Sequence, residues 1–159
     1  MSMRVQELTE QFERVNAELI AALGRCGDER WGARCADTGW TAAVQADHFG
    51  AGQAFIADRI GRIARGEADA PLPIAVIEQA NEQRAAERAG GSRDEAIALL
   101  RENGAAMAQL IRGLSDEQLA RVGTIVEEVP AQSVEQWIVY LSIGEIERHG
   151  GRLREAVGA

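Results

Sequence analysis

Residues 40–65, WTAAVQADHFGAGQAFIADRIGRIAR, carry the clearest indication of the fold. Their apolar side chains recur three and four residues apart, which is the spacing of one face of an α-helix. Thr41 is suited to cap this helix, because its hydroxyl can accept a hydrogen bond from an unpaired backbone N–H of the first turn. The segment therefore predicts a helix from Thr41 to about Arg65. Its predicted inward positions are Val44, His48, Ala51, Phe55, Ile56, Arg59 or Ile60, and Ile63.

Helical periodicity continues through most of the remaining chain. The segments at 5–24, 92–113 and 133–157 have regular apolar stripes, whereas the segment at 74–88 is more polar and should be more exposed. Ser92 and Glu95 form the Ser-x-x-Glu pattern of a capping box at the start of the fourth helix. The predicted helices outside residues 41–65 cover residues 5–24, 74–88, 92–113 and 133–157.

The connecting segments lack this periodicity. Residues 27–39 contain glycines and charges and predict a loop, and the glycines and prolines of 66–73 break the chain. Residues 115–130 predict a short turn at SDEQL, followed by an irregular stretch, TIVEEV, that could pair as a strand. A chain of 159 residues suits one domain, spanning 1–159, and we predict an all-α four-helix bundle with short extra helical segments.

Composition excludes several classes of function. The chain has 17 basic and 25 acidic side chains, so its net charge is 17 − 25 = −8, and no stretch concentrates arginine without acids. This charge opposes nucleic-acid binding. All basic residues are arginine, which excludes lysine chemistry. No apolar run is long enough to span a membrane, so we expect a soluble, cytoplasmic protein.

The two cysteines give no sign of a disulfide or a metal site. Cys26 and Cys35 are nine residues apart, without the CxxC spacing of redox or zinc sites. We expect both to be reduced thiols. A domain of about 150 residues buries enough surface to fold without disulfides or a metal, so a metal here would be functional rather than structural.

The last predicted helix has a stripe that changes from apolar to polar. Val134, Trp137, Ile138 and Leu141 are followed on the same stripe by Glu145, by Arg148 or His149, and by Arg152. Glu145 and His149 are four residues apart, so their side chains share one face of the helix. His48 is the only other histidine. Two imidazoles and one carboxylate form the three-ligand set of catalytic zinc and non-haem iron sites.

Each of these residues also has a simpler interpretation. His48 could be a buried neutral imidazole bonded to a carbonyl, and Glu145 could be an ordinary partner of His149 on the helix surface. Arg148 and Arg152 could bind an anionic substrate, but arginines in surface salt bridges would look the same in the sequence.

Three segments together resemble a known family. GWTAAVQADHF at 39–49 is similar to the Gly-Trp-Ser/Thr-x6-His signature of the DinB-like superfamily of metal-binding four-helix bundles. IGEIERHGGRLREA at 143–156 resembles the last helix of that family, and the segment at 92–119 resembles its fourth-helix region. The resemblance implies a bundle of the up-down-down-up type. It also places the three ligand positions of the family on His48, Glu145 and His149.

The glutamate at position 145 is similar to that of the mycothiol-dependent maleylpyruvate isomerase branch. The resemblance thus implies a divalent metal, zinc in the first place and nickel or iron otherwise. It also implies a thiol of low molecular weight, such as mycothiol, bacillithiol or glutathione, and a thiol S-transferase or isomerase reaction on a small molecule. The alternatives are a non-catalytic bundle that binds a small ligand or stabilises a partner as a homodimer, and a metal-assisted hydrolase.

Overall fold

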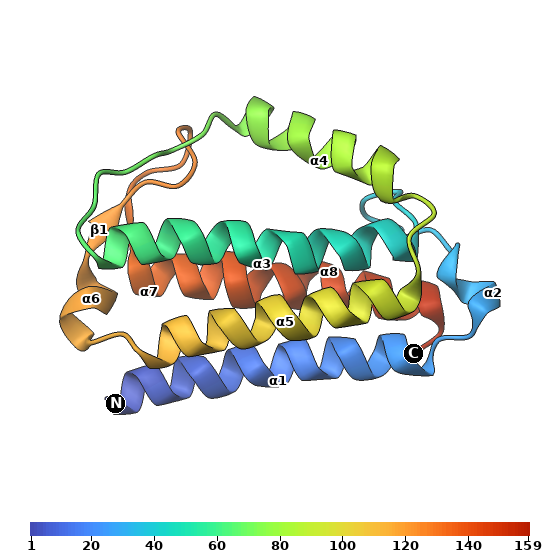
Figure 1. Ribbon diagram of the computed structural model, residues 1–159, viewed down its shortest axis with the longest axis horizontal. Coiled ribbons are helices and arrows are strands. Elements are labelled where there is room, and N and C mark those ends of the chain that lie inside the picture. The colour runs from blue at the N-terminus through green and yellow to red at the C-terminus, as the bar shows by residue number, and fades with distance from the viewer.

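Four long helices form a bundle in the computed structural model, which describes residues 1–159 (Figure 1). α1 and the C-terminal helix run in one direction, and α3 and α5 run in the other, as predicted for the up-down-down-up type. The C-terminal helix consists of three consecutive segments, α7, η1 and α8. The bounds are α1 Met3–Arg25, α3 Ala42–Ala64, α5 Arg93–Arg112, α7 Val134–Trp137, η1 Ile138–Ile143 and α8 Gly144–Val157.

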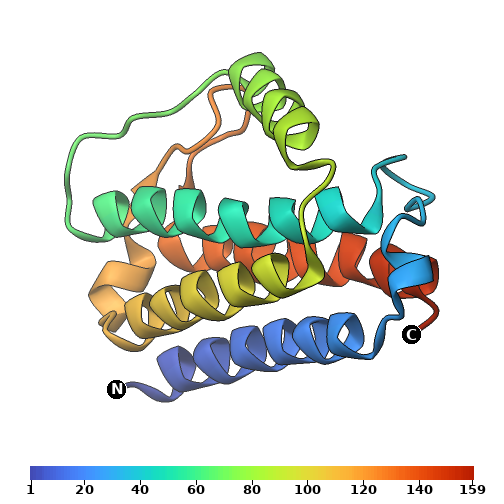
Figure 2. The same ribbon diagram turned by 45° about the vertical axis from the view of Figure 1, so that its right-hand side comes forward.

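α4, Ile74–Arg88, connects the parallel helices α3 and α5. Because α3 and α5 run in the same direction, the chain must return along the length of the bundle between them. α4 makes this return on the outside of the bundle, over α3 (Figures 1 and 2). The predicted bounds of this helix agree with the structure, and so does its predicted exposure, since none of its residues is buried.

The predicted helix caps are present, although one is incomplete. The Thr41 hydroxyl accepts a hydrogen bond of 3.3 Å from the backbone N–H of Val44, and the Ser92 hydroxyl accepts one of 3.1 Å from the N–H of Glu95. The Glu95 carboxylate does not return to Ser92, as a capping box requires. It lies instead 3.1 Å from the guanidinium of Arg88, so the ion pair replaces half of the predicted box.

The core lies between α1, α3, α5 and the C-terminal helix. Trp137 is fully buried, and its indole N–H donates a 3.0 Å hydrogen bond to the carbonyl of Gly123. Each large apolar side chain buried in this way stabilises the fold by about 1.5–3 kcal/mol. Other fully buried side chains include Leu8, Phe12, Leu19, Leu23, Ile60, Leu100, Met107, Ile111, Ile125, Ile138 and Ile143.

The connections contain more structure than the sequence predicts. The expected loop at 27–39 includes a short helix, α2 (Asp28–Trp31), and the expected turn at SDEQL is a helix, α6 (Asp116–Ala120). Ser115 and Gln118 explain the second difference, because their side chains and backbones form a complete capping box. A turn was therefore the wrong prediction for a segment that carries its own helix start.

The predicted strand is displaced from TIVEEV. The short antiparallel pair consists of β1 (Val122–Gly123) and β2 (Gln132–Ser133), which flank this stretch. Within it, Val126 forms only an isolated bridge with Leu72. That bridge fastens the chain after α3 to the segment before the C-terminal helix.

The C-terminal helix contains a π-helical segment, η1, which changes its inward face. A π-turn holds an extra residue, so every side chain after it is rotated relative to a continuous α-helix. The buried row of α8 consequently consists of Ile146, Gly150, Leu153 and Val157. The predicted inward stripe through Glu145, His149 and Arg152 is thus wrong in its second half. Glu145 and His149 lie half-buried at the border of the bundle, and Arg152 is exposed.

None of the helices combines the length and the apolar character that a membrane crossing requires.

Candidate functional site

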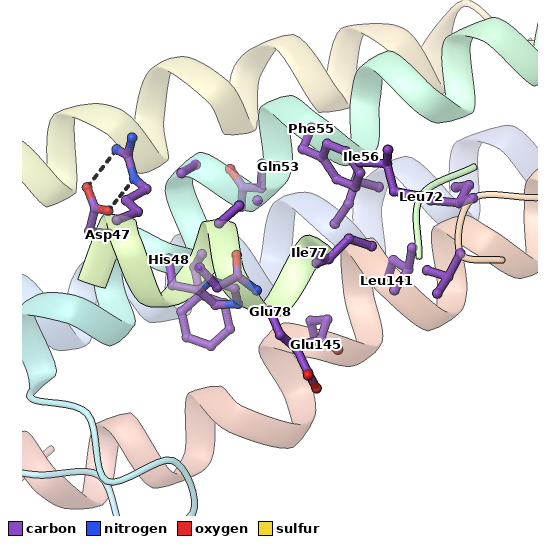
Figure 3. A pocket seen from close by; sticks show the side chains of 18 of the residues that line it. Asp47, His48, Gln53, Phe55, Ile56, Leu72, Ile77, Glu78, Leu141 and Glu145 are labelled. Atoms are coloured by element: carbon purple, nitrogen blue, oxygen red, sulfur yellow. Dashed lines mark hydrogen bonds and ion pairs between the residues drawn. The ribbon is translucent and has the colours of Figure 1, made fainter. Parts of the chain in front are cut away.

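A cavity of about 700 Å³ lies under α4 (Figure 3). α3 and α4 supply most of its lining, and the segments around Leu72, Val126 and Leu141 supply the remainder. The lining is mainly apolar, as is typical of small-molecule sites. Figure 3 shows Asp47 and His48 toward one end of the cavity and Phe55, Ile56 and Leu72 toward the other.

Asp47 holds α4 over this cavity. Its buried carboxylate accepts hydrogen bonds of 2.6 and 3.0 Å from the guanidinium of Arg84 and lies 3.3 Å from Nε of Arg88. The hydrogen bond to Asp47 raises the pKa of Arg84 above its ordinary value. Since α4 has no buried residue, these ion pairs make a principal attachment between α4 and the bundle. Asp47 is a site residue that the sequence analysis missed.

His48 lies next to Asp47 and also lines the cavity. Its ring contacts Trp40 edge to face, with 5.1 Å between the ring centroids. Burial lowers the pKa of His48, and the charge of Glu145 opposes this effect. A neutral imidazole has one nitrogen with a free lone pair, which is the form that binds metals. The prediction that His48 faces inward is confirmed in the sense that it lines this cavity.

Glu145 and His149 form a chain of contacts with Asp37. Nε2 of His149 lies 3.7 Å from Oε2 of Glu145, and Nδ1 of His149 lies 2.5 Å from Oδ2 of Asp37. Burial opposes ionisation of Asp37, but hydrogen bonds from His149 and from the Thr38 N–H hold the pKa of Asp37 below its ordinary value. In the neutral tautomer of His149 that donates a hydrogen bond from Nδ1 to an ionised Asp37, the lone pair is on Nε2, the nitrogen that faces Glu145.

Asp37 gave no signal in the sequence. It lies in the aperiodic segment before α3, more than one hundred residues from its partner His149. Its own carboxylate accepts a 2.9 Å hydrogen bond from the N–H of Thr38, which is a common turn-forming contact of aspartate. That local role alone would explain an aspartate here, so the contact with His149 becomes visible only in three dimensions.

His48, Glu145 and His149 offer the nitrogen and oxygen atoms that bind divalent cations, but these atoms do not surround a single point. No three His, Cys, Asp or Glu side chains in this structure converge closely enough to hold a metal ion. Two donor atoms, Nε2 of His149 and Oε2 of Glu145, already face each other at 3.7 Å. Asp37 behind His149 matches the carboxylate–histidine arrangement that orients metal ligands. His48 is close enough to both partners for their charges to act on its pKa.

Arg148 and Arg152 lie outside the cavity. Arg148 donates a 3.0 Å hydrogen bond to Oε1 of Glu145, and its guanidinium stacks 4.6 Å from the ring centroid of Tyr140. Arg152 pairs with Glu155 at 2.9 Å and is exposed. Arg148 thus holds one oxygen of Glu145 and leaves the other facing His149. Substrate binding by these two arginines stays a prediction.

The structure resembles two solved structures over almost its whole length. One is YfiT from Bacillus subtilis, described as a probable metal-dependent hydrolase with an unusual four-helix bundle topology. The match covers 98% of this chain and 87% of YfiT, with a TM-score of 0.80 and 19% sequence identity. For a mutant of the mycothiol-dependent maleylpyruvate isomerase, the TM-score is 0.77 and the identity 14%. The match there covers this whole chain but only 64% of that protein. At these identities the likeness concerns the fold.

No curated protein is significantly similar to this chain in sequence. A family model does match: that of the DinB superfamily aligns with residues 11–153. The aligned range includes His48, Glu145 and His149 and all four long helices of the bundle in part or in full. The chain therefore belongs to the DinB superfamily.

Proposed function

We propose that this chain binds a divalent metal ion through His48, Glu145 and His149, and that the centre serves a thiol S-transfer or isomerisation reaction on a small molecule. The observation that carries the proposal is the orientation of His149. Its Nδ1 is engaged by Asp37 at 2.5 Å, and its Nε2 faces Glu145 at 3.7 Å. A surface pair of glutamate and histidine needs no such support from a third, distant carboxylate.

Each residue of the site has a separate part in this proposal. Asp37 fixes the ring of His149, and Arg148 fixes one oxygen of Glu145. Trp40 packs against His48 and limits its rotation. A divalent cation at this position would lower the pKa of a thiol or a water molecule bound to it. The apolar cavity beside His48 would take the body of the substrate and exclude water from it.

The two structural relatives support the proposal in kind. One is described as a probable metal-dependent hydrolase and the other as a mycothiol-dependent isomerase. Both histidines of this chain are ligands in the proposed site, so no histidine is left to act as a general base. The reactive group would accordingly be a thiol or a water molecule rather than a side chain activated by histidine.

Metal content tests the first half of the proposal. Protein purified without chelators and loaded with zinc, nickel or iron should retain about one equivalent after dialysis, measured by inductively coupled plasma mass spectrometry. Glu145→Gln and His48→Ala should lose it. Glu147→Gln is the matched control, because Glu147 is an exposed glutamate on the same helix. Absence of retained metal in the wild type, or equal retention in Glu145→Gln, would refute the site.

The second half is tested with thiols. The loaded protein should consume mycothiol, bacillithiol or glutathione in the presence of an electrophilic small molecule, and Glu145→Gln should not. A second candidate function is a bundle that binds a small ligand without catalysis, and the size of the apolar cavity favours it. Retained metal and bound ligand without turnover of any thiol would select this candidate.

A further inference from the structure

Arg59 is an unusual residue for the apolar end of the cavity. Its side chain lines the cavity and is only 19% exposed. One terminal nitrogen donates to the carbonyl of Ala70, and the guanidinium stacks 5.0 Å from the ring centroid of Phe55. Nε is buried and has no hydrogen-bond partner. The nearest acid, Asp58, is 62% exposed and lies 3.7 Å from Nε, too far for a hydrogen bond.

A buried guanidinium without a full set of partners is costly, because its charge is removed from water and not neutralised. The other arginine that lines the cavity, Arg84, is compensated by Asp47 through two hydrogen bonds. Arg59 has no comparable carboxylate. An anionic group in the cavity would supply one, and a carboxylate matches the planar fork of a guanidinium.

The two ends of the cavity differ in chemistry. His48 lies toward one end, and Arg59 stands beside Phe55, which Figure 3 places toward the other. His48 and Arg59 are eleven residues apart on α3, which corresponds to about 16 Å along the helix axis. The walls between them are mainly apolar and include Ile56 and Ile77, with Gln53, Glu78 and Asn81 as the polar part of the lining. The shape and polarity thus suit a linear molecule that is apolar along its length and anionic at one tip.

We propose that the cavity binds a linear monocarboxylate whose carboxylate pairs with Arg59 and whose apolar chain extends toward His48. A carboxylate lies about 3 Å from the guanidinium that it pairs with, which leaves about 13 Å of the distance for the chain. An extended chain advances about 1.2 Å per bond, so about ten to twelve carbons span this remainder. As an identification of the substrate class, this inference rests on the proposed function. The binding step itself involves Arg59 and the apolar walls and needs no metal.

The test is calorimetric titration of chelator-treated protein with dodecanoate, dodecanol and dodecylamine. The wild type should bind the acid most tightly. Arg59→Met should weaken binding of the acid by about ten- to a hundred-fold, the value of a hydrogen-bonded charge pair, and should leave binding of the alcohol unchanged. Arg62→Met is the matched control, since Arg62 lies one turn further along α3 and does not line the cavity.

Chain length gives a second measurement that needs no variant. Each added methylene should tighten binding about three- to four-fold from hexanoate upward, and the gain should stop at about ten to twelve carbons. Equal binding of acid and alcohol by the wild type, or equal binding of the acid by wild type and Arg59→Met, would overturn the inference.

The metal proposal and this inference fail separately. His149→Ala, at a proposed metal ligand that does not line the cavity, should abolish metal retention and leave the affinity of the chelator-treated protein for dodecanoate unchanged. Arg59→Met should do the reverse. Loss of dodecanoate binding in a folded His149→Ala protein would contradict a binding step that depends only on Arg59 and the walls of the cavity.

Discussion

α5 and α4 cover different sides of α3, and they are held there in different ways (Figures 1 and 2). α5 packs against the bundle through buried side chains such as Leu100, Met107 and Ile111. α4 buries no residue and is attached through the ion pairs of Asp47. The two sides of α3 thus have different roles. The α5 side provides stability, and the α4 side leaves room for a cavity that a ligand can enter.

The largest expected effect on this comparison is the loss of unfolding free energy when a large side chain is shortened to alanine on each side of α3. Leu100→Ala on α5 should lower the free energy of unfolding by about 2–5 kcal/mol, because Leu100 is fully buried. Ile77→Ala on α4 should cost less than about 1 kcal/mol, because Ile77 is only partly buried and borders an existing cavity. Urea denaturation monitored by circular dichroism measures both. Similar losses would show that α4 belongs to the stabilising core.

Asp47→Asn tests the attachment of α4 directly. Removal of the buried negative charge leaves Arg84 without its partner and leaves Arg88 paired with Glu95 alone, which should cost about 1–3 kcal/mol locally. Hydrogen–deuterium exchange should therefore become faster over residues 74–88 and stay unchanged over 93–112. Asp58→Asn is the control, because Asp58 lies on the same helix but is 62% exposed. Faster exchange in both helices would contradict an independent attachment of α4.

The same comparison shows what the sequence can predict. The four long helices follow from apolar periodicity, because each buries a continuous face and burial selects that spacing. α4 was predicted as exposed for the same reason. The cavity beneath it was not predictable, since it depends on Asp47 reaching arginines 37 and 41 residues away. Such an ion pair leaves no periodic trace in the sequence.

The candidate site shows the same limit. The four-residue spacing predicts that Glu145 and His149 share a helix face, and the structure places their side chains 3.7 Å apart. The rotation of that face away from the core was missed, because it comes from the π-helical turn at 138–143. No single residue type specifies such a turn. Asp37 was missed because its partner is 112 positions away.

Two glycines of α3 give a smaller and sharper test. A Cβ atom at Gly50 would lie 2.9 Å from Cγ of Leu99 on α5, whereas one at Gly52, which lines the cavity, would meet nothing within 4 Å. Gly50→Ala should destabilise the fold by about 1 kcal/mol through crowding. Gly52→Ala should stabilise it by up to about 1 kcal/mol, because alanine favours the helix. Thermal unfolding of the two variants should shift in opposite directions, and a stabilising Gly50→Ala would contradict close packing against α5.

The smallest effect at neutral pH concerns Cys35, in the loop that carries Asp37 and Trp40 to the site. Although this loop belongs to the cavity side, Cys35 is buried in the core. Burial, followed by the charge of Asp37, raises the pKa of the Cys35 thiol from 9.0 to about 11. At pH 8 only about one thiol in a thousand is then ionised, so iodoacetamide should leave Cys35 unmodified unless the protein unfolds.

The sign of the pH dependence follows from the same shift. The fold favours the neutral thiol, so this contribution to stability is complete below pH 9 and is lost as the pH rises through about 11. Cys35→Ser should remove that part of the alkaline loss, and Cys26→Ser, at a second buried thiol, serves as the comparison. Urea midpoints of the three proteins between pH 7 and 11 measure the effect. Rapid alkylation of Cys35 in the native protein at pH 8 would show instead that this loop opens and exposes the thiol. The loop would then belong with α4 to the weakly held side of the molecule and not to the core.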